Sequence, residues 1–210
     1  MPRLRTIDRL ASVAEDQWGL LTRRQAEEAG VPPSTFDRAA AEGSLLERMA
    51  HGVYRLAGAP LPDHAELRAA WLQLAPSTPA WQRTFDQGVV SHRSAAALYG
   101  FGHLPADVHE FTVPSRRQTR RTDVRLHQRR FADTECTWHR GLPLTKPART
   151  AADLLADHED PESVAHVIGD ALRGGADAGP FVDAMAPFAA RFGLRRNDGF
   201  GVFRWLLDLI

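Results

Sequence analysis

The stretch that decides the fold of the first part of the chain is Thr22-Arg-Arg-Gln-Ala-Glu-Glu-Ala-Gly-Val-Pro-Pro-Ser-Thr-Phe-Asp37. Thr22 and the glutamine three residues later have the spacing of a capping box, which predicts a helix starting at Thr22. Gly30 accepts the positive φ of a helix C-terminus, and the two prolines after Val31 do not continue a helix, so a turn is expected. A second helix should be capped by Ser34 and end at Gly43. Two short helices joined by a tight turn are typical of a helix-turn-helix.

The flanking residues complete a winged helix-turn-helix. Two short apolar runs, 45–49 and 53–56, flank a turn at Ala50-His-Gly52, as expected for a hairpin wing. An amphipathic helix over residues 4–16 supplies an apolar stripe for packing. We therefore expect residues 1–59 to form a winged helix-turn-helix DNA-binding domain.

DNA binding is the first hypothesis because the second helix is short enough to enter a major groove beside the wing. Ser34, Thr35 and Arg38 lie near the start of this helix and suit contacts with phosphates and base edges. An alternative stays open, since helix-turn-helix geometry also occurs in modules that bind protein. Residues 1–59 carry 8 basic and 8 acidic side chains, so they lack the basic excess of a typical nucleic-acid binder.

Charge is unevenly distributed, although the chain has 26 basic and 26 acidic residues and a net charge of zero. Residues 111–150 have 10 basic and 3 acidic side chains, whereas residues 151–210 have 5 and 10. The excess lies in the basic block 115–130, which contains Arg116, Arg117, Arg120, Arg121, Arg125, Arg129 and Arg130. Arginine binds phosphate oxygens in pairs, so the block predicts contacts with a nucleic-acid backbone. The alternative is a solvated surface that pairs with the acidic final third.

The second domain is expected over residues 60–210, after a Gly- and Pro-containing linker at 58–62. Its pattern predicts a mixed α/β domain with C-terminal helices, so the fold class of the chain is α+β. The predicted strands are 108–113, 124–127, 135–138 and 142–144. The predicted helices are 63–74, one capped by Ser91, one capped by Thr145 with Pro147 in its first turn, 161–172, 179–190 and 197–210.

No catalytic residue, cofactor or metal site is predicted, and we do not expect an enzyme. The nine histidines lack zinc-type spacing, and Asp133-Thr-Glu135 resembles a paired-acid metal motif without its phosphate loop. A metal-dependent nuclease needs an acidic residue two positions before its lysine, whereas Leu144 precedes Lys146, the sole lysine. The single cysteine, Cys136, excludes an internal disulfide framework, and no stretch approaches the about 20 apolar residues that span a bilayer. We therefore expect a cytoplasmic protein without membrane contact.

Three blocks occur in a fixed order, at residues 18–55, 90–101 and 141–154. They begin with Trp18-Gly-Leu-Leu-Thr22, Val90-Ser-His-Arg-Ser94 and Gly141-Leu-Pro-Leu-Thr145. In these blocks the chain, over roughly residues 5–157, resembles the AbiEi antitoxin family. The resemblance implies a transcriptional repressor that is the antitoxin of a type IV toxin-antitoxin operon and binds inverted repeats in the double-stranded DNA of its own promoter.

The resemblance also implies a partner and further contact residues. The functional partner would be a nucleotidyltransferase-like toxin, without a stable complex. The implied DNA contacts on the first helix and the wing are Arg23, Arg24, Arg48, His51 and Arg55. Two alternatives remain: a protein that neutralises its toxin by direct contact, through the acidic final third and the apolar tail 205–210, or a winged-helix repressor unrelated to any toxin.

Overall fold

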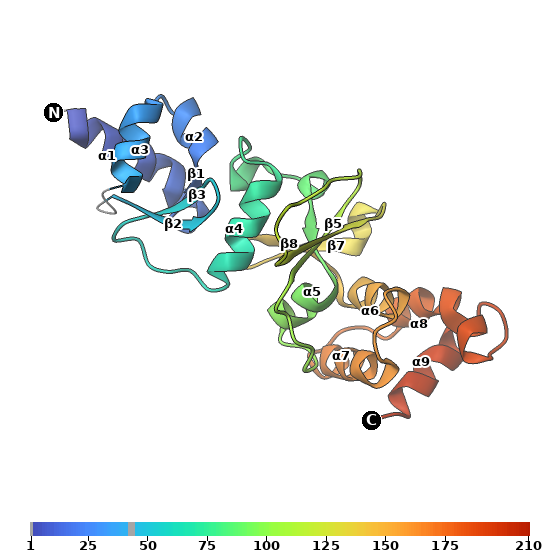
Figure 1. Cartoon of the computed structure of the whole chain (residues 1–210). Coiled ribbons are helices and arrows are strands. Elements are labelled where there is room, and N and C mark those ends of the chain that lie inside the picture. Colours follow the sequence, from blue (N-terminus) through green and yellow to red (C-terminus); the bar gives the residue numbers. More distant parts are fainter. Residues whose placement is uncertain (1, 42–44) are drawn as a thin grey trace. The chain divides into compact units, whose positions relative to one another are not determined.

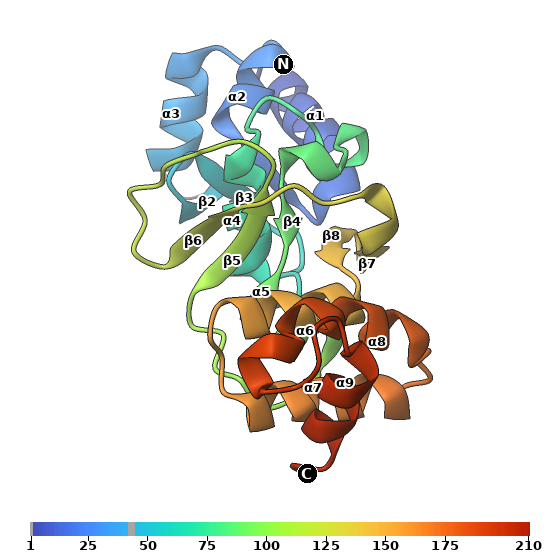
Figure 2. The same ribbon diagram turned by 90° about the vertical axis from the view of Figure 1, so that its right-hand side faces the viewer.

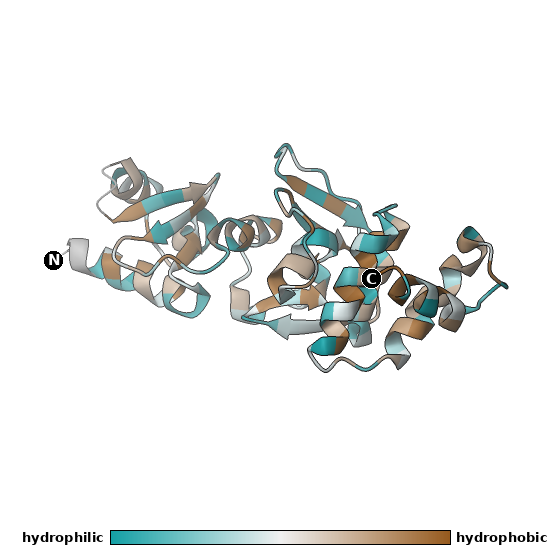
Figure 3. Ribbon diagram, turned by 90° about the horizontal axis from the view of Figure 1, so that it is seen from below, coloured by the Kyte–Doolittle hydropathy of each residue, from teal (hydrophilic) through white to brown (hydrophobic). Residues whose placement is uncertain are grey.

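The computed structural model describes residues 2–41 and 45–210. The chain divides into two compact units, Met1–Gly88 and Val89–Ile210, each with its own hydrophobic core (Figure 1). Hydrophobic and hydrophilic residues alternate along the ribbons of both units, as expected for amphipathic elements (Figure 3). Gly43, the predicted end of the second helix, lies outside the described residues.

The first unit contains the predicted winged helix-turn-helix, with an antiparallel sheet in the order β1-β3-β2. The predicted capping box at Thr22 is confirmed: its hydroxyl accepts from the Gln25 N–H at 3.1 Å, and the Gln25 side-chain oxygen accepts from the Thr22 N–H at 2.9 Å. In chain order the elements are α1 (Pro2–Ala14), the 3-10 helix η1 (Glu15–Gln17), β1 (Leu20–Thr22), α2 (Arg23–Glu28), α3 (Pro33–Ala41), β2 (Leu46–Ala50) and β3 (Val53–Leu56).

The core of this domain joins the helices to the wing. Leu10 and Ala14 of α1 pack with Phe36 of α3 and Leu46 of β2, all of them buried. The Phe36 ring meets Tyr54 of β3 edge to face at 4.9 Å between centroids, so this tyrosine anchors the wing to α3. The position of α3 therefore depends on contacts with both α1 and the wing.

Two local predictions in this domain were incomplete or wrong. Strand β1 was missed, because a three-residue strand gives little periodicity before its partner β3 is known. The second helix begins at Pro33, one residue before the predicted cap Ser34, because proline suits the first helical position. Ser34 and Thr35 therefore lie inside the first turn of α3.

The first unit continues to Gly88, past the domain boundary expected near residue 60. Residues 60–88 form α4 (Ala65–Leu74) and the 3-10 helices η2 (Ala80–Gln82) and η3 (Phe85–Gln87). The buried guanidinium of Arg83 holds this segment, donating to the carbonyls of Trp71 at 2.6 Å and Leu72 at 2.8 Å. Helix α4 contacts all three strands of the sheet. These contacts explain why the first unit ends at Gly88 and not near residue 60.

The second unit has a five-stranded mixed sheet in the order β6-β5-β4-β8-β7 (Figure 2). Its last helices cluster at one end of the unit around a core that includes Leu154, Ile168 and Phe181. The elements are β4 (Val89–Val90), α5 (His92–Tyr99), β5 (His109–Val113), β6 (Val124–Gln128), the 3-10 helix η4 (Asp133–Glu135), β7 (Cys136–His139), β8 (Leu142–Thr145), α6 (Pro147–Ala156), α7 (Pro161–Arg173), α8 (Gly179–Met185), the 3-10 helix η5 (Ala186–Phe192) and α9 (Gly199–Leu207).

The predicted strands and helices of this unit are confirmed within a few residues, but the caps differ. Thr145 is not the cap of α6: Lys146 takes that position, and the Thr145 hydroxyl bonds to Thr150 at 2.7 Å. Ser91 precedes α5 as predicted, yet its hydroxyl faces a ring nitrogen of His92 at 2.9 Å. A carboxylate oxygen of Glu110 accepts from the Arg93 N–H instead, at 2.9 Å, so β5 supplies the cap of α5.

Candidate nucleic-acid interface

Helix α3, the predicted recognition helix, has one buried and one exposed face. Phe36 and Ala39 are buried in the core, whereas Ser34 and Arg38 are exposed and Thr35 is half-buried. The three polar residues lie in the first two turns of the helix, where hydroxyl and guanidinium groups can reach phosphates and base edges. The structure therefore brings these three predicted residues together on one accessible segment.

Arg23, at the start of α2, is held by two carboxylates. Its guanidinium lies 2.7 Å from Asp37 of α3 and 3.0 Å from Glu27 of α2, and it sits over the Phe36 ring at 5.6 Å. The hydrogen bond to Asp37, and then that to Glu27, raises the pKa of Arg23. This arginine links α2 to α3 and so positions the recognition helix, whereas Arg24 beside it is exposed.

The wing presents two of its three predicted residues to solvent. Arg48 of β2 and His51 in the turn are exposed, with 3.5 Å between Arg48 Nη2 and His51 Nδ1. Arg55 of β3 is different, because its side chain is only 17% exposed and pairs with Glu47 at 2.5 Å. Arg55 also donates to the carbonyl of Ala59, so its guanidinium is engaged within the domain.

The basic block lies on the second unit, mostly in the loop 114–123 that joins the parallel strands β5 and β6. Arg116, Arg117 and Arg120 are exposed in this loop. Arg121 is half-buried and pairs with Asp123, chiefly through a side-chain hydrogen bond that lowers the pKa of that carboxyl to about 2.

Arg129 and Arg130 follow β6 and are also exposed. The Arg129 N–H donates to the carbonyl of Val113 at 3.2 Å, so Arg129 lies beside the residue from which the loop departs. The sheet therefore brings together two parts of the basic block that are separated along the sequence. Arg125 points elsewhere, 3.5 Å from Glu110 and 3.7 Å from Asp157, which is the contact with the acidic final third that the alternative interpretation expected.

Sequence reasoning missed a buried polar cluster in the second unit. Ser91, His92, Glu110 and Thr112 are all at most 3% exposed, and the Thr112 hydroxyl donates to Ser91 at 2.9 Å. Burial, and next to it the neighbouring His127, lowers the pKa of His92 to about 3. The dipeptide Ser91-His92 lies in one of the three sequence blocks, but its partners are 18 or more residues away, so spacing gave no signal.

A winged helix-turn-helix with an exposed second helix is typical of transcriptional regulators. The comparisons agree: a family model described as "Transcriptional regulator, AbiEi antitoxin" matches residues 8–57, and one described as "AbiEi antitoxin C-terminal domain" matches residues 88–174. Together they cover about two thirds of the chain. The chain belongs to the AbiEi antitoxin family.

A search of curated proteins gave no match. Among the described residues, no helix combines the length and the apolar character needed to cross a bilayer.

Proposed function

We propose that this protein is a DNA-binding repressor that acts as the antitoxin of a type IV toxin-antitoxin operon and binds inverted repeats in its own promoter. The observation that carries the proposal is the exposed segment of α3 with Ser34, Thr35 and Arg38, fixed over the buried Phe36. This segment lies within the residues matched by the transcriptional-regulator model. In this proposal residues 1–59 read the operator, and the antitoxin domain, expected over 60–210, is the second unit Val89–Ile210.

The two regions have separate roles in the proposal. Base edges are read by side chains of α3, because groove contacts carry sequence information. Arg24, Arg48 and His51 contact phosphates beside it. Additional backbone affinity comes from the block arginines other than Arg125, since phosphate contacts position a protein without reading sequence. They are Arg116, Arg117, Arg120, Arg121, Arg129 and Arg130. Arg23 and Arg55 act by holding α3 and the wing in place, because their guanidinium groups are already paired.

Arg38→Ala tests base readout by α3. The expected result is a loss of about 1–3 kcal/mol in binding free energy for the promoter fragment, with a much smaller loss for a scrambled fragment of equal length. Fluorescence anisotropy at fixed salt measures both affinities. The exposed Arg204 of α9 provides the matched control, Arg204→Ala, which should leave both affinities unchanged. An equal loss on the two fragments would remove Arg38 from base readout.

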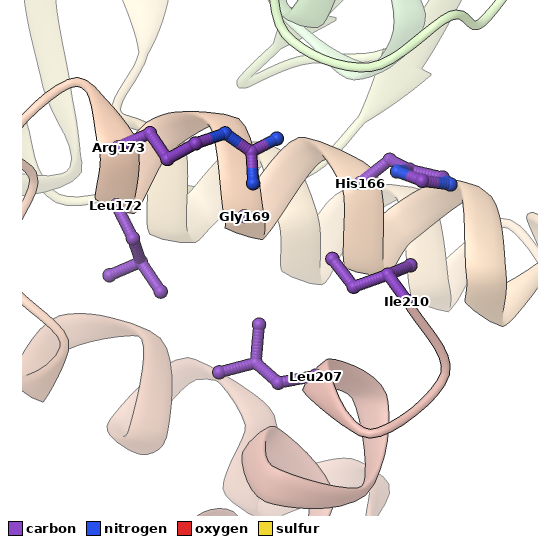
Figure 4. A pocket seen from close by; sticks show the side chains of 6 residues that line it. All are labelled: His166, Gly169, Leu172, Arg173, Leu207 and Ile210. Carbon is purple, nitrogen blue, oxygen red and sulfur yellow. The ribbon is translucent and has the colours of Figure 1, made fainter.

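Direct contact with a toxin is the second candidate function, and one feature of the C-terminal helices favours it. A cavity of about 490 Å³ lies between α7 and the end of α9, where Leu172, Leu207 and Ile210 point toward one another (Figure 4). Ile210 is 47% exposed and Phe200 of α9 is 61% exposed. An apolar hollow with an exposed apolar rim is a feature that protein-binding surfaces share, whereas single exposed apolar side chains are common on any protein.

Co-expression with the protein encoded by the adjacent gene separates the two functions. The type IV proposal expects protection of the cells without a complex that survives affinity purification. A stable complex between the two proteins would instead support neutralisation by contact. A neighbouring gene that encodes no toxin would leave a repressor with another role.

A further inference from the structure

Three side chains of metal-ligating types meet in the second unit. His92 is the first residue of α5, His127 belongs to β6, and Asp157 directly follows α6. One potential ligand atom from each lies within 4.8 Å of the other two. His92 and Asp157 also line a cavity of about 70 Å³.

The buried ring of His92 has one unused nitrogen. Its Nδ1 lies 2.9 Å from the Ser91 hydroxyl, whereas Nε2 has no hydrogen-bond partner among the described residues. His92 is only 1% exposed, so bulk water does not reach Nε2 to form a hydrogen bond. Buried polar atoms without partners are rare and cost free energy, which points to a ligand that completes the site.

His127 has the support that metal-binding histidines commonly have. Its Nε2 lies 3.4 Å from Oε1 of Glu110, a carboxylate that is 3% exposed. A carboxylate on one ring nitrogen fixes the ring and leaves the other nitrogen for a metal ion.

We propose that His92, His127 and Asp157 bind a divalent transition-metal ion of the Zn²⁺ or Fe²⁺ type. Two imidazoles and one carboxylate form a donor set that such ions accept, whereas Mg²⁺ and Ca²⁺ prefer oxygen ligands alone. The cavity has room for an ion and a water molecule on its open coordination position, but not for an organic substrate. The site lies outside the proposed DNA contacts and does not depend on them.

Binding requires two small side-chain movements. The rings of His92 and His127 stack at 3.6 Å between centroids with 14° between their planes, so one ring turns about its Cβ–Cγ bond for the nitrogen lone pairs to converge. Arg125 lies 3.7 Å from Asp157, and its side chain is 60% exposed, so it can move into solvent and release the carboxylate.

The carboxylates that line the cavity favour a cation once Arg125 has moved, and they oppose the positive charge that Arg129 and Arg149 bring near His92. The remaining charged side chains that line it are the carboxylates of Glu110, Asp157 and Glu159 and the guanidinium of Arg93. The guanidinium pairs with Glu159 at 2.6 Å, so the negative charge of the other two carboxylates is left for the ion. A bound ion would join α5, β6 and the end of α6, and would fix the strand that follows the arginine loop.

Zinc titration of the purified full chain tests the site. After treatment with EDTA and removal of the chelator, isothermal titration calorimetry with ZnCl₂ should give one bound ion per chain, and MgCl₂ should give none. Co²⁺ should show a visible d–d absorption band that is shifted and stronger than that of the aqueous ion, which reports coordination by the protein without any assay of DNA binding. His127→Gln and Asp157→Asn should each weaken zinc binding at least about tenfold.

The matched control is His103→Gln, which changes an exposed histidine of the same unit outside the cluster and should bind zinc as the original chain does. If His127→Gln does not fold, as judged by circular dichroism, Asp157→Asn at a side chain 40% exposed still decides the question. Absence of zinc binding by the original chain, or unchanged affinity in the folded ligand variants, would overturn the proposal.

Discussion

The recognition helix α3 and the arginine loop 114–123 both expose arginine, but they hold it differently. Around α3, carboxylates engage Arg23 and Arg55, and the exposed Arg38 rises from a helix whose other face is packed in the core. In the loop, Arg116 and Arg120 project from an irregular segment that joins two parallel strands. Side chains fixed on a helix suit the reading of bases, whereas exposed positive charge on a loop suits the attraction of phosphates. The difference predicts specificity from the first unit and non-specific affinity from the second.

The largest effect is expected from a substitution that disrupts the packing of α3. Phe36→Ala removes a ring that is fully buried under α3, and substitutions of this kind cost about 3–5 kcal/mol of the free energy of unfolding. We expect chemical denaturation to show early unfolding of the first unit and loss of specific DNA binding.

The only cysteine of the chain provides the control for Phe36→Ala. Cys136 lies in β7 of the second unit, and burial raises the pKa of its thiol to about 12. Its reaction with iodoacetamide should stay as slow in the variant as in the original chain, because the second unit has its own core. Faster alkylation would mean that the two units unfold together.

Local sequence signals predicted most of the helix-turn-helix, but little of the structure that depends on contacts between distant residues. The Thr22 capping box and the Gly30 turn depend on residues a few positions apart, so they could be predicted. Strands β1 and β4 have three and two residues and depend on distant partners, so they could not. The role of Arg83, whose bonds extend the first unit to Gly88, required the tertiary structure.

The candidate site divides in the same way. The clustering of arginines is visible in the sequence. In the structure Arg38, Arg116 and Arg120 are exposed, as a DNA contact requires. The sequence could not predict that Arg23 and Arg55 are paired with carboxylates, because Asp37 and Glu47 meet them only in the folded domain. Contact of these residues with DNA stays a prediction.

A smaller effect is expected from substitutions in the arginine loop 114–123. If Arg116 and Arg120 each contact a phosphate, the double variant Arg116→Ala/Arg120→Ala should flatten the slope of log affinity against log salt by about 1.8, that is about 0.9 per contact. The loss should be the same for operator and scrambled DNA, in contrast to Arg38→Ala. Arg195→Ala/Arg196→Ala removes the same charge from exposed positions of the same unit and should not change the slope. An unchanged slope in the loop variant would remove this role.

The smallest expected effect concerns Arg121. Removing its partner carboxylate should steepen the salt slope of DNA binding, whereas the loop variant flattens it. Its partner Asp123 has a pKa lowered to about 2, chiefly by the hydrogen bond from Arg121, so the pair stays charged at the pH of any DNA-binding measurement. Because the folded pKa lies below the unfolded value, the stability from this pair is complete above about pH 4 and is lost as the pH falls through 2. Asp123→Asn should cost less than about 1 kcal/mol of stability, since the carboxyl is near the surface.

The same variant removes the carboxylate that pairs with Arg121, so the loop gains one net positive charge. We expect the salt slope of DNA binding to become steeper by up to about 0.9, measured by anisotropy on scrambled DNA. Asp133→Asn, at an exposed carboxyl outside the loop, controls for the loss of one negative charge. If both variants steepen the slope equally, the effect is one of net charge, and Arg121 makes no contact of its own.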